Sequence, residues 1–520
     1  MKYRNLFLAL LLCQSVMIIP AAYSQDSSPY TQGYEAPAFT DAMRYQRLQA
    51  LFPAVESMYR SFADKNHFPG YTFGIMLDGK LVFSGAGGYT DIDKKIPATT
   101  KSMFRIASMS KSFTAMAILH LRDAGKLDLD DPVWKYIPEV KGLKLTADAP
   151  EITIRHLLTH SAGFPEDNPW GDRQLAATEK DLTDLIRRGV NLSNAAGLTY
   201  EYSNLGFTML GVIIRKASGI GYGEYIRKNI WEPLGMNQAE WEFDRVPAAQ
   251  LAHGYRWIDN AWKEEPLLHD GIYGAMGGMI TSLESFSKYV ALHQDAWPPR
   301  SVNDNGPVRR SSVREMHQPW RFNTISPNYK YPDGRLCPLA SAYGYGLRWT
   351  RDCEQRTVVG HSGGLPGFGS NWQIATDYGI GVIFFANVTY ASTTGINLRV
   401  LDTLIRTAGL RPAALEPSVI LKDRQAALLK LLPDWNNATA SGLFAENFFK
   451  DYQLESLKKE SAAIFKKAGR TGKVISFVAE NQLRGSFVVA GEFMDIRISF
   501  TLTPENPALI QEYHIYEVAR

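Results

Sequence analysis

The stretch that decides the fold is FRIASMSKSFTA, residues 104–115. Apolar residues recur after it at helical spacing and predict a helix that ends near Gly125: Phe113, Met116, Ala117 and Leu121. Ser108 and Lys111 are three positions apart and share one face of that helix, so the lysine amine is expected to reach the serine hydroxyl. A neighbouring amine with a lowered pKa can activate a serine, and a helix N-terminus stabilises an oxyanion. The stretch therefore predicts a nucleophilic serine with its base.

The pattern S-x-x-K alone is weak, because the chain also contains it at residues 285–288 and 456–459. Two further segments distinguish the first copy. Residues 202–204 (YSN) supply the Tyr202 phenol, which can relay a proton, and the Asn204 amide, which can hold a substrate carbonyl. Residues 360–364 (GHSGG) supply an imidazole, a hydroxyl and flexible backbone amides.

Strand-like segments lie at both ends of a long helical region. Residues 71–77 and 80–86 predict a hairpin, because Asp78-Gly79 between them is a strong turn signal. Other segments read as strands near residues 345–349, 356–359, 372–375 and 381–386. Residues 40–63 and most of 105–300 have helical patterns. The pattern predicts an α+β fold, in which an antiparallel sheet assembled from distant parts of the chain lies beside an all-helical region.

A second, smaller domain is predicted at the C-terminal end. Gly409, Pro412 and Pro417 mark a linker, which we place at residues 411–417. Beyond it, a helical stretch at 445–468 precedes strand-like runs at 474–479, 485–489 and 495–502. We therefore expect a catalytic domain over residues 40–410 and an accessory α+β domain over 418–520 that holds no catalytic residues.

The first 24 residues have the pattern of a secretory signal. Lys2 and Arg4 precede an apolar run over residues 6–19, and Ala22-Tyr23-Ser24 is the expected cleavage site. The alternatives are an uncleaved anchor, for which the run is short, and a lipoprotein through Cys13, for which Leu12 is too bulky. The prediction is a periplasmic or secreted protein with no membrane span after cleavage.

Composition and charge exclude several classes of protein. The chain has 520 residues, 45% of them hydrophobic and 21% charged, as in globular proteins. The 56 basic and 53 acidic residues leave a net charge of +3, so no nucleic-acid partner is expected. After export, Cys337 and Cys353 either form a disulfide or remain free thiols. His156 and His160 lack the glutamate of a metalloprotease helix, and no metal is expected.

Six segments together resemble the serine β-lactamase-related family. They occur in order over about residues 40–410: 104–115, 156–165 (HLLTHSAGFP), 202–211 (YSNLGFTMLG), 232–236 (EPLGM), 274–282 (GAMGGMITS) and 361–368 (HSGGLPGF). This family includes class C β-lactamases, penicillin-binding D-Ala-D-Ala carboxypeptidases, D-aminopeptidases and related esterases. The resemblance implies an antiparallel sheet flanked by helices, with the site in a cleft beside an all-helical region.

The resemblance also implies roles for individual residues. Ser108 would be acylated, Lys111 would be its base, and Tyr202 would pass the proton to the leaving group. Substrate would be bound by Asn204, His361 and Ser362. The oxyanion would be bound by the backbone N–H groups of Ser108 and Gly364. The implied reaction is acyl transfer to water, without metal or organic cofactor.

Position 361 departs from the lysine that many relatives carry there. A histidine is mostly neutral at pH 7, so a substrate carboxylate would be held less firmly. We therefore expect an esterase or D-amino-acid peptidase rather than a dedicated β-lactamase, unless Arg348 or Arg105 restores the positive charge. The substrate is expected to be a small ester, amide, peptide or β-lactam; neither its identity nor the oligomeric state follows from the sequence.

Two rival interpretations remain open at this point. Residues 360–364 also fit G-x-S-x-G, which would make Ser362 the nucleophile of an α/β-hydrolase and requires a following helix. Pro366 and Gly367 argue against that helix. The other rival is a non-catalytic binding protein that keeps the fold, against which the complete set of Ser108, Lys111 and Tyr202 argues.

Overall fold

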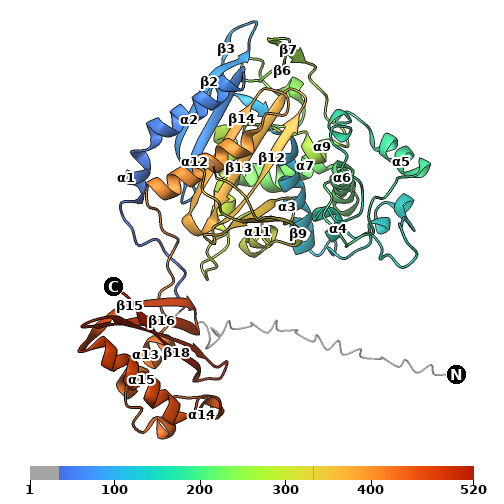
Figure 1. Ribbon diagram of the computed structural model, residues 1–520. Coiled ribbons are helices and arrows are strands. Elements are labelled where there is room, and N and C mark those ends of the chain that lie inside the picture. Colours follow the sequence, from blue (N-terminus) through green and yellow to red (C-terminus); the bar gives the residue numbers. More distant parts are fainter. Residues whose placement is uncertain (1–33, 332) are drawn as a thin grey trace, which may run out of the picture. The chain divides into compact units, whose positions relative to one another are not determined.

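The computed structural model describes residues 34–331 and 333–520, which divide into two compact units (Figure 1). The larger unit, Ala36–Ala414, contains Ser108 and the other predicted site residues and is called the catalytic unit for that reason; the C-terminal unit contains Leu415–Arg520. The predicted signal segment, residues 1–24, lies outside the described residues. No helix in the described part of the chain is both long and apolar enough to cross a membrane.

A nine-stranded antiparallel sheet forms the centre of the catalytic unit. The strand order is β3-β2-β1-β14-β13-β12-β11-β10-β9. The strands are β1 Gly70–Leu77, β2 Lys80–Asp91, β3 Ile96–Pro97, β9 Arg321–Ser326, β10 Leu339–Tyr343, β11 Arg348–Asp352, β12 Thr357–Leu365, β13 Phe368–Ala375 and β14 Ile380–Ala386. Tyr71 of β1 pairs with Ala386 of β14, so distant parts of the chain meet inside the sheet, which confirms the predicted α+β fold.

The first hairpin shows why the sequence pairs in this register. Asp78 and Gly79, between β1 and β2, both have positive φ, at 49° and 78°. A two-residue hairpin turn of this kind needs positive φ at both positions, which aspartate tolerates and glycine adopts freely. The turn places every residue of β1 in the interior, packed between the helices on either face of the sheet.

Three helices cover one face of the sheet, as Figure 1 shows for α2 and α12. They are α1 Arg44–Gln49, α2 Phe52–Lys65 and α12 Thr393–Thr407. Residues 40–63 were expected to form one helix, but the chain breaks at Ala50 and Leu51, and α2 starts with Pro53 in its first turn. Tyr59 of α2 is fully buried against the sheet, and its hydroxyl donates to Asn397 Oδ1 of α12 over 2.7 Å.

Helices cover the other face and extend into the predicted helical region. They are α3 Ser110–Asp123, α4 Ile154–Leu158, α5 Glu179–Arg188, α6 Asn204–Ser218, α7 Tyr222–Ile226, α8 Glu232–Leu234, α9 Gly274–Gly277, α10 Leu283–Asp295 and α11 Arg310–Met316. Short strands join them: β4 Met103–Arg105, β5 Ala239–Glu240, β6 Gly254–Ile258, β7 Ala261–Glu265 and β8 Ile280–Ser282. Helix α3 contacts α6 and α9, and α10 contacts β1 and β14.

The sequence patterns described above predict no helix or strand within residues 301–338, but the structure has both there. Helix α11 packs on α3, and β9 is the edge strand of the large sheet. Strand β9 was not predicted, because its half-exposed or exposed residues lack the alternation of apolar and polar residues that predicts strands.

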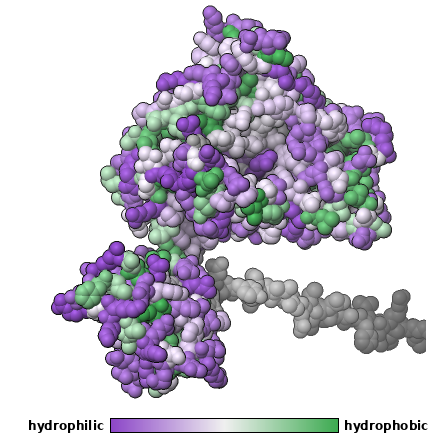
Figure 2. Space-filling view, viewed as in Figure 1, coloured by the Kyte–Doolittle hydropathy of each residue, from purple (hydrophilic) through white to green (hydrophobic). Residues whose placement is uncertain are grey.

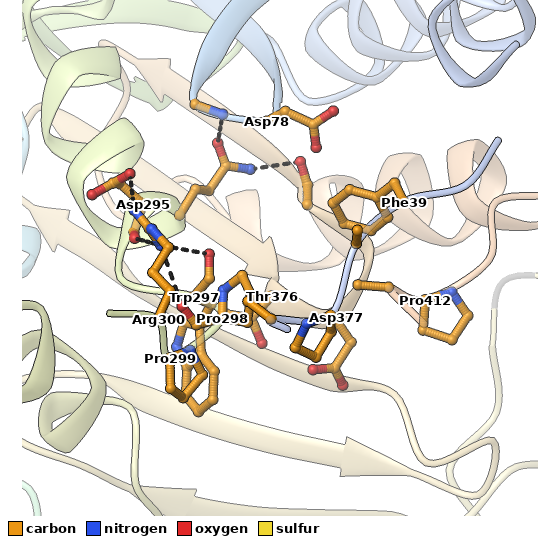
Figure 3. Close-up of a pocket in the computed structure, with 17 residues that line it drawn as sticks. Phe39, Asp78, Asp295, Trp297, Pro298, Pro299, Arg300, Thr376, Asp377 and Pro412 are labelled. Carbon is orange, nitrogen blue, oxygen red and sulfur yellow. Dashed lines mark hydrogen bonds and ion pairs between the residues drawn. The ribbon is translucent and has the colours of Figure 1, made fainter. Parts of the chain in front are cut away.

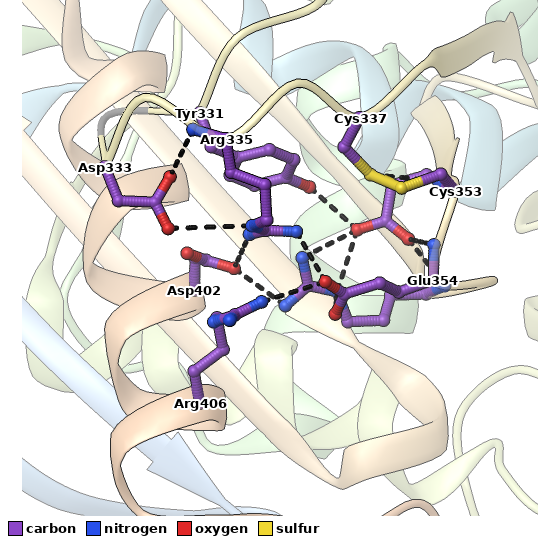
Figure 4. A network of polar contacts seen from close by, with 10 residues as sticks. Tyr331, Asp333, Arg335, Cys337, Cys353, Glu354, Asp402 and Arg406 are labelled. Atoms are coloured by element: carbon purple, nitrogen blue, oxygen red, sulfur yellow. Dashed lines mark hydrogen bonds and ion pairs between the residues drawn. A yellow bond between two sulfur atoms is a disulfide. The ribbon is translucent and has the colours of Figure 1, made fainter.

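A disulfide and an ionic network fasten this segment to the rest of the unit (Figure 4). Cys337 and Cys353 are joined, with Cα atoms 5.3 Å apart. Next to them, Asp402 of α12 accepts from Arg335 over 3.0 Å and from the buried Arg356 over 2.7 Å. The network thus connects the segment before β10, the β11–β12 turn and α12.

The C-terminal unit is a four-stranded antiparallel sheet packed on helices, with strand order β15-β16-β17-β18. Its elements are α13 Val419–Leu431, α14 Phe448–Asp451, α15 Leu454–Ala468, β15 Thr471–Asn481, β16 Arg484–Gly491, β17 Asp495–Leu502 and β18 Ile510–Val518. Strand β18 and helix α13 were not anticipated. Alternate residues of β17 are buried, including Ile496, Ile498 and Phe500, so the sheet has one face toward the helices.

A cavity of about 670 Å³ lies where the chain enters and leaves the catalytic unit (Figure 3). Its wall is mainly apolar and includes Phe39, Trp297 and Pro412. Gln294 crosses it, accepting from the Gly79 N–H over 3.1 Å and donating to the Gly379 carbonyl over 3.0 Å. Neither Ser108 nor Lys111 lines this cavity.

One glycine in β12 is required by close packing. A Cβ atom on Gly363 would lie 2.2 Å from the Ile106 carbonyl oxygen and 2.4 Å from Ser370 Oγ. We expect Gly363→Ala to destabilise the catalytic unit by about 1–3 kcal/mol, the usual cost of overpacking. Denaturant unfolding followed by tryptophan fluorescence would measure it.

Gly395→Ala is the matched control, because Gly395 is exposed on α12 and a Cβ there meets nothing within 4 Å. We expect that variant to be neutral or slightly stabilising. Equal destabilisation by both substitutions would contradict the assigned packing role of Gly363.

Candidate active site

Ser108 lies in a single turn of 3₁₀ helix, Ala107–Met109, that leads directly into α3. Ala107 has φ 51°, in the left-handed region that residues with a side chain seldom adopt. The serine is 7% exposed, while most neighbouring residues of the turn and of α3 are fully buried. The start of α3 therefore presents the hydroxyl at the floor of a small opening.

Strand β12 runs against the turn that carries Ser108. The side chain of Ser370, on the adjacent β13, donates to the Ile106 carbonyl over 2.7 Å. Gly363 leaves room for this approach, as its missing Cβ shows. The contact brings Gly364 and Ser362 of β12 to the same pocket as Ser108.

Lys111 is fully buried, and its amine points at Ser108. The Nζ atom is 2.9 Å from Ser108 Oγ, 2.7 Å from Asn204 Oδ1 and 2.8 Å from the Met276 carbonyl oxygen. Helices α3, α6 and α9 thus each contribute to one amine. The i and i+3 geometry predicted for Ser108 and Lys111 is present.

Burial lowers the pKa of Lys111 to about 7. The negative charges of Asp172 and Asp167 act in the opposite direction, whereas Arg348 disfavours the charged amine further. A lysine with this pKa is partly neutral at physiological pH and can accept a proton from a serine, which an ordinary lysine cannot.

Tyr202 lies directly beside the serine and remains a phenol. It hydrogen-bonds Ser108, and burial raises its pKa far above its usual value. Its ring centre is 4.9 Å from Lys111 Nζ and 4.2 Å from the ring centre of His160. Tyr202 is therefore suited to pass a proton rather than to act as the resting base.

His160 positions this tyrosine, a role that the sequence analysis did not assign. Its Nδ1 accepts from the backbone N–H of Ser203 over 3.1 Å, directly after Tyr202. Its ring is buried, and this burial lowers its pKa well below the usual value. The sequence signal for this role was that HLLTH (156–160) and YSN (202–204) both belong to the segments that resemble the family.

Asn204 begins α6 and is fully buried. Its carbonyl oxygen accepts from Lys111, and its amide nitrogen donates to Asn168 Oδ1 over 2.5 Å. In this structure both ends of the amide are bound within the protein. Contact between Asn204 and substrate stays a prediction.

His361 is also buried, with both ring nitrogens occupied. Nδ1 is 2.6 Å from the Ser362 carbonyl oxygen, which can only accept, so Nδ1 carries the hydrogen. The Tyr343 hydroxyl then donates to Nε2 over 2.8 Å. Burial lowers the pKa of His361 well below its usual value, so the ring is neutral at pH 7. Contact between His361 and substrate stays a prediction.

The pocket above Ser108 has a volume of about 160 Å³. The sequence had indicated five of the lining residues: Ser108, Tyr202, Ser362, Gly364 and Arg348. It had not indicated the other three, Asn168, Asp172 and Tyr390. Arg348 is exposed on β11, and its guanidinium carbon is 5.5 Å from the Tyr202 ring centre. Arg105 instead is buried and donates to the carbonyls of Gly278 and Leu268. Arg348 is thus the arginine that faces the pocket.

The rival serine motifs lack comparable partners. Ser362 lies within β12, and the chain continues into β13 rather than the helix that a nucleophile elbow needs. On α10, Ser285 accepts from the Gln238 N–H, and Lys288 donates to the Gly235 carbonyl. Across residues 34–331 and 333–520, no three or more His, Cys, Asp or Glu side chains cluster as metal ligands.

Comparison with known proteins places this chain in a family. The model of the Beta-lactamase family matches residues 55–405. Penicillin-binding protein 4* of Bacillus subtilis is 28% identical over 353 residues, which cover 64% of this chain and 71% of that protein. Protein flp of Staphylococcus aureus is 28% identical over 339 residues, covering 64% of this chain and 62% of its own length, so less than two thirds of that relative is matched.

Two solved structures share the fold. The octameric penicillin-binding protein homologue from Pyrococcus abyssi has a TM-score of 0.55 and 22% identity, over 90% of this chain and 96% of the other. A penicillin-binding protein from Bacillus halodurans has a TM-score of 0.53 and 23% identity, over 67% and 98% of the two chains.

The pKa of Lys111 predicts how the reactivity of Ser108 depends on pH. Only the neutral amine can take the serine proton, and its fraction grows as pH rises through about 7. We expect phosphonylation of Ser108 by a fluorophosphonate to accelerate about tenfold from pH 6 to pH 8 and then level off.

Stopped-time labelling between pH 5.5 and 9, corrected for hydrolysis of the probe, would measure this profile. Lys111→Gln, which removes the base, should label at least a hundredfold more slowly with no inflection near pH 7. A flat profile for the unsubstituted protein would show that Lys111 is not the base.

Proposed function

Because the chain belongs to the Beta-lactamase family, we propose that it is an exported serine hydrolase that acts on ester or amide substrates through an acyl-enzyme on Ser108. The observation that carries the proposal is the contact between the buried Lys111 amine and Ser108 Oγ. A charged lysine buried without an ionic partner is costly, and its lowered pKa is what a catalytic base needs.

Each proton and bond in the proposed reaction is accounted for. Ser108 Oγ attacks the substrate carbonyl carbon while its proton passes to Lys111. The carbonyl oxygen becomes an oxyanion that the backbone N–H groups of Ser108 and Gly364 bind. Lys111 returns the proton through Tyr202 to the leaving alcohol or amine, and the acyl-enzyme forms. Water then attacks that ester by the same path, releases the acid and restores Ser108.

We propose an esterase or peptidase activity ahead of a dedicated β-lactamase activity. The pocket has no lysine at position 361, and the neutral, buried His361 offers no cation to a carboxylate. Among the described residues of the pocket lining, Arg348 is the one that carries a guanidinium, and its side chain is exposed. These observations favour substrates that have either no carboxylate or one that can pair with Arg348.

The first test separates the two candidate serines. Ser108→Ala should abolish labelling by a fluorophosphonate or a fluorescent penicillin and should abolish hydrolysis of p-nitrophenyl esters, nitrocefin and D-Ala-D-Ala peptides. Ser362→Ala should keep a labelled serine and measurable turnover. Labelling that survives Ser108→Ala refutes the assignment, and an unlabelled but folded parent protein would favour a non-catalytic binding role.

The second test concerns Arg348. We expect Arg348→Gln to lower kcat/KM for nitrocefin and N-acylated D-Ala-D-Ala by about tenfold relative to p-nitrophenyl acetate, which carries no carboxylate, since an ionic hydrogen bond is lost. Arg351→Gln, on the same strand but outside the pocket lining, is the matched control. If Arg348→Gln slows all three substrates equally, Arg348 does not select for carboxylates.

A further inference from the structure

One wall of the pocket carries an acidic group that the proposed reaction does not use. Asp172 is 2% exposed and lines the pocket that contains Ser108. Its Oδ2 accepts from the Tyr390 hydroxyl over 3.1 Å. Its Oδ1 is buried and has no hydrogen-bond partner among the residues that the structure describes. A buried carboxylate oxygen without a donor is costly, so a ligand atom that donates a hydrogen bond would be favoured there.

Tyr390 forms the adjoining part of the wall. Its backbone N–H lies close to the carbonyls of Leu365 and Phe368, at the β12–β13 turn. Its ring packs over Gly364, because a Cβ on Gly364 would lie 2.9 Å from the ring. The aromatic face and the Asp172 carboxylate thus lie next to the strand that is expected to bind the oxyanion.

The unpaired oxygen of Asp172 distinguishes it from Asp167, the other aspartate near the site. Both oxygens of Asp167 are occupied by the first backbone N–H groups of α6, those of Asn204 and Leu205, over 2.7 and 2.8 Å. Asp167 therefore caps a helix, whereas Asp172 keeps one oxygen free. Arg173, its neighbour, reaches toward Glu265 rather than lining the pocket.

We propose that Asp172 and Tyr390 form a subsite for a protonated amino group on the acyl part of the substrate. This inference rests on the proposed function, because it takes the pocket above Ser108 as the acyl site. A carboxylate beside an aromatic ring binds an ammonium group through an ionic hydrogen bond and a cation–π contact. The substrate class is then an aminoacyl ester or amide, including peptides with a free amino terminus.

The arrangement of charges in the pocket supports this class. Arg348 and Asp172 both line it, so it offers one site for a negative group and one for a positive group. Lys111 does not oppose the ammonium while it serves as base, since it is then neutral. The volume of about 160 Å³ suits a single small residue rather than a bulky acyl chain.

The test compares two ligands that differ only in charge. D-alaninamide and isobutyramide have the same shape, with NH₃⁺ in the first replaced by CH₃ in the second; L-alaninamide tests the configuration. Binding to the Ser108→Ala protein is measured by NMR titration at pH 7.5, so the result does not depend on turnover. We expect at least one alaninamide enantiomer to bind about tenfold more tightly than isobutyramide.

Asp172→Asn should remove this preference while it leaves the affinity for isobutyramide within about twofold. Asp377→Asn, the same change at an aspartate of the cavity in Figure 3, is the control and should keep the preference. Thermal melting of each variant checks folding. Equal binding of the three amides by the Ser108→Ala protein overturns the inference without any variant.

Failure of the inference can be told from failure of the proposed function. Labelling of Ser108 with equal binding of charged and neutral amides leaves a serine hydrolase without an ammonium subsite. Absence of labelling refutes the proposed function, and the NMR comparison still decides whether the pocket binds ammonium groups.

Discussion

The buried amine of Lys111 is the constraint on which the site depends. No carboxylate within residues 34–331 and 333–520 contacts it directly, and three neutral acceptors from three parts of the chain surround it: Ser108, Asn204 and the Met276 carbonyl. Removing an ammonium group from water is expensive, so the fold keeps this amine near the point of losing its proton. Helices α3, α6 and α9 must therefore pack closely for the chemistry to exist. Polar side chains dominate much of the face seen in Figure 2, whereas the reactive groups are almost entirely buried.

Sequence patterns were informative where one local rule decides the outcome. The Asp78-Gly79 turn predicted the first hairpin, and the spacing of Ser108 and Lys111 predicted the contact between Lys111 Nζ and Ser108 Oγ. They were uninformative where tertiary packing decides. Strand β9 has little apolar alternation, and Asp172 has no motif around it; only the folded chain brings Asp172 to the pocket through η4, the short 3₁₀ helix Gly171–Arg173.

The packing of His361 changes the interpretation of the histidine at a position where many relatives are expected to carry lysine. From sequence, His361 was a weaker cation at the place of a lysine. In the structure the ring is neutral and bound on both sides, by Tyr343 and by the Ser362 carbonyl. Its packing supports β12 next to Ser108, and the guanidinium of Arg348 lies at the rim instead. The positive charge in the described pocket lining therefore comes from β11 and not from position 361 on β12.

The catalytic unit begins and ends at one place. Ala38 pairs with Ala414 in an isolated antiparallel bridge, with hydrogen bonds of 3.0 and 2.9 Å in the two directions. A unit whose ends meet can be inserted into a surface loop of another protein, or joined to a different neighbour, without stretching its own chain. Because the bridge joins the two ends of this unit, we expect a different domain fused at either end to leave the geometry around Ser108 unchanged.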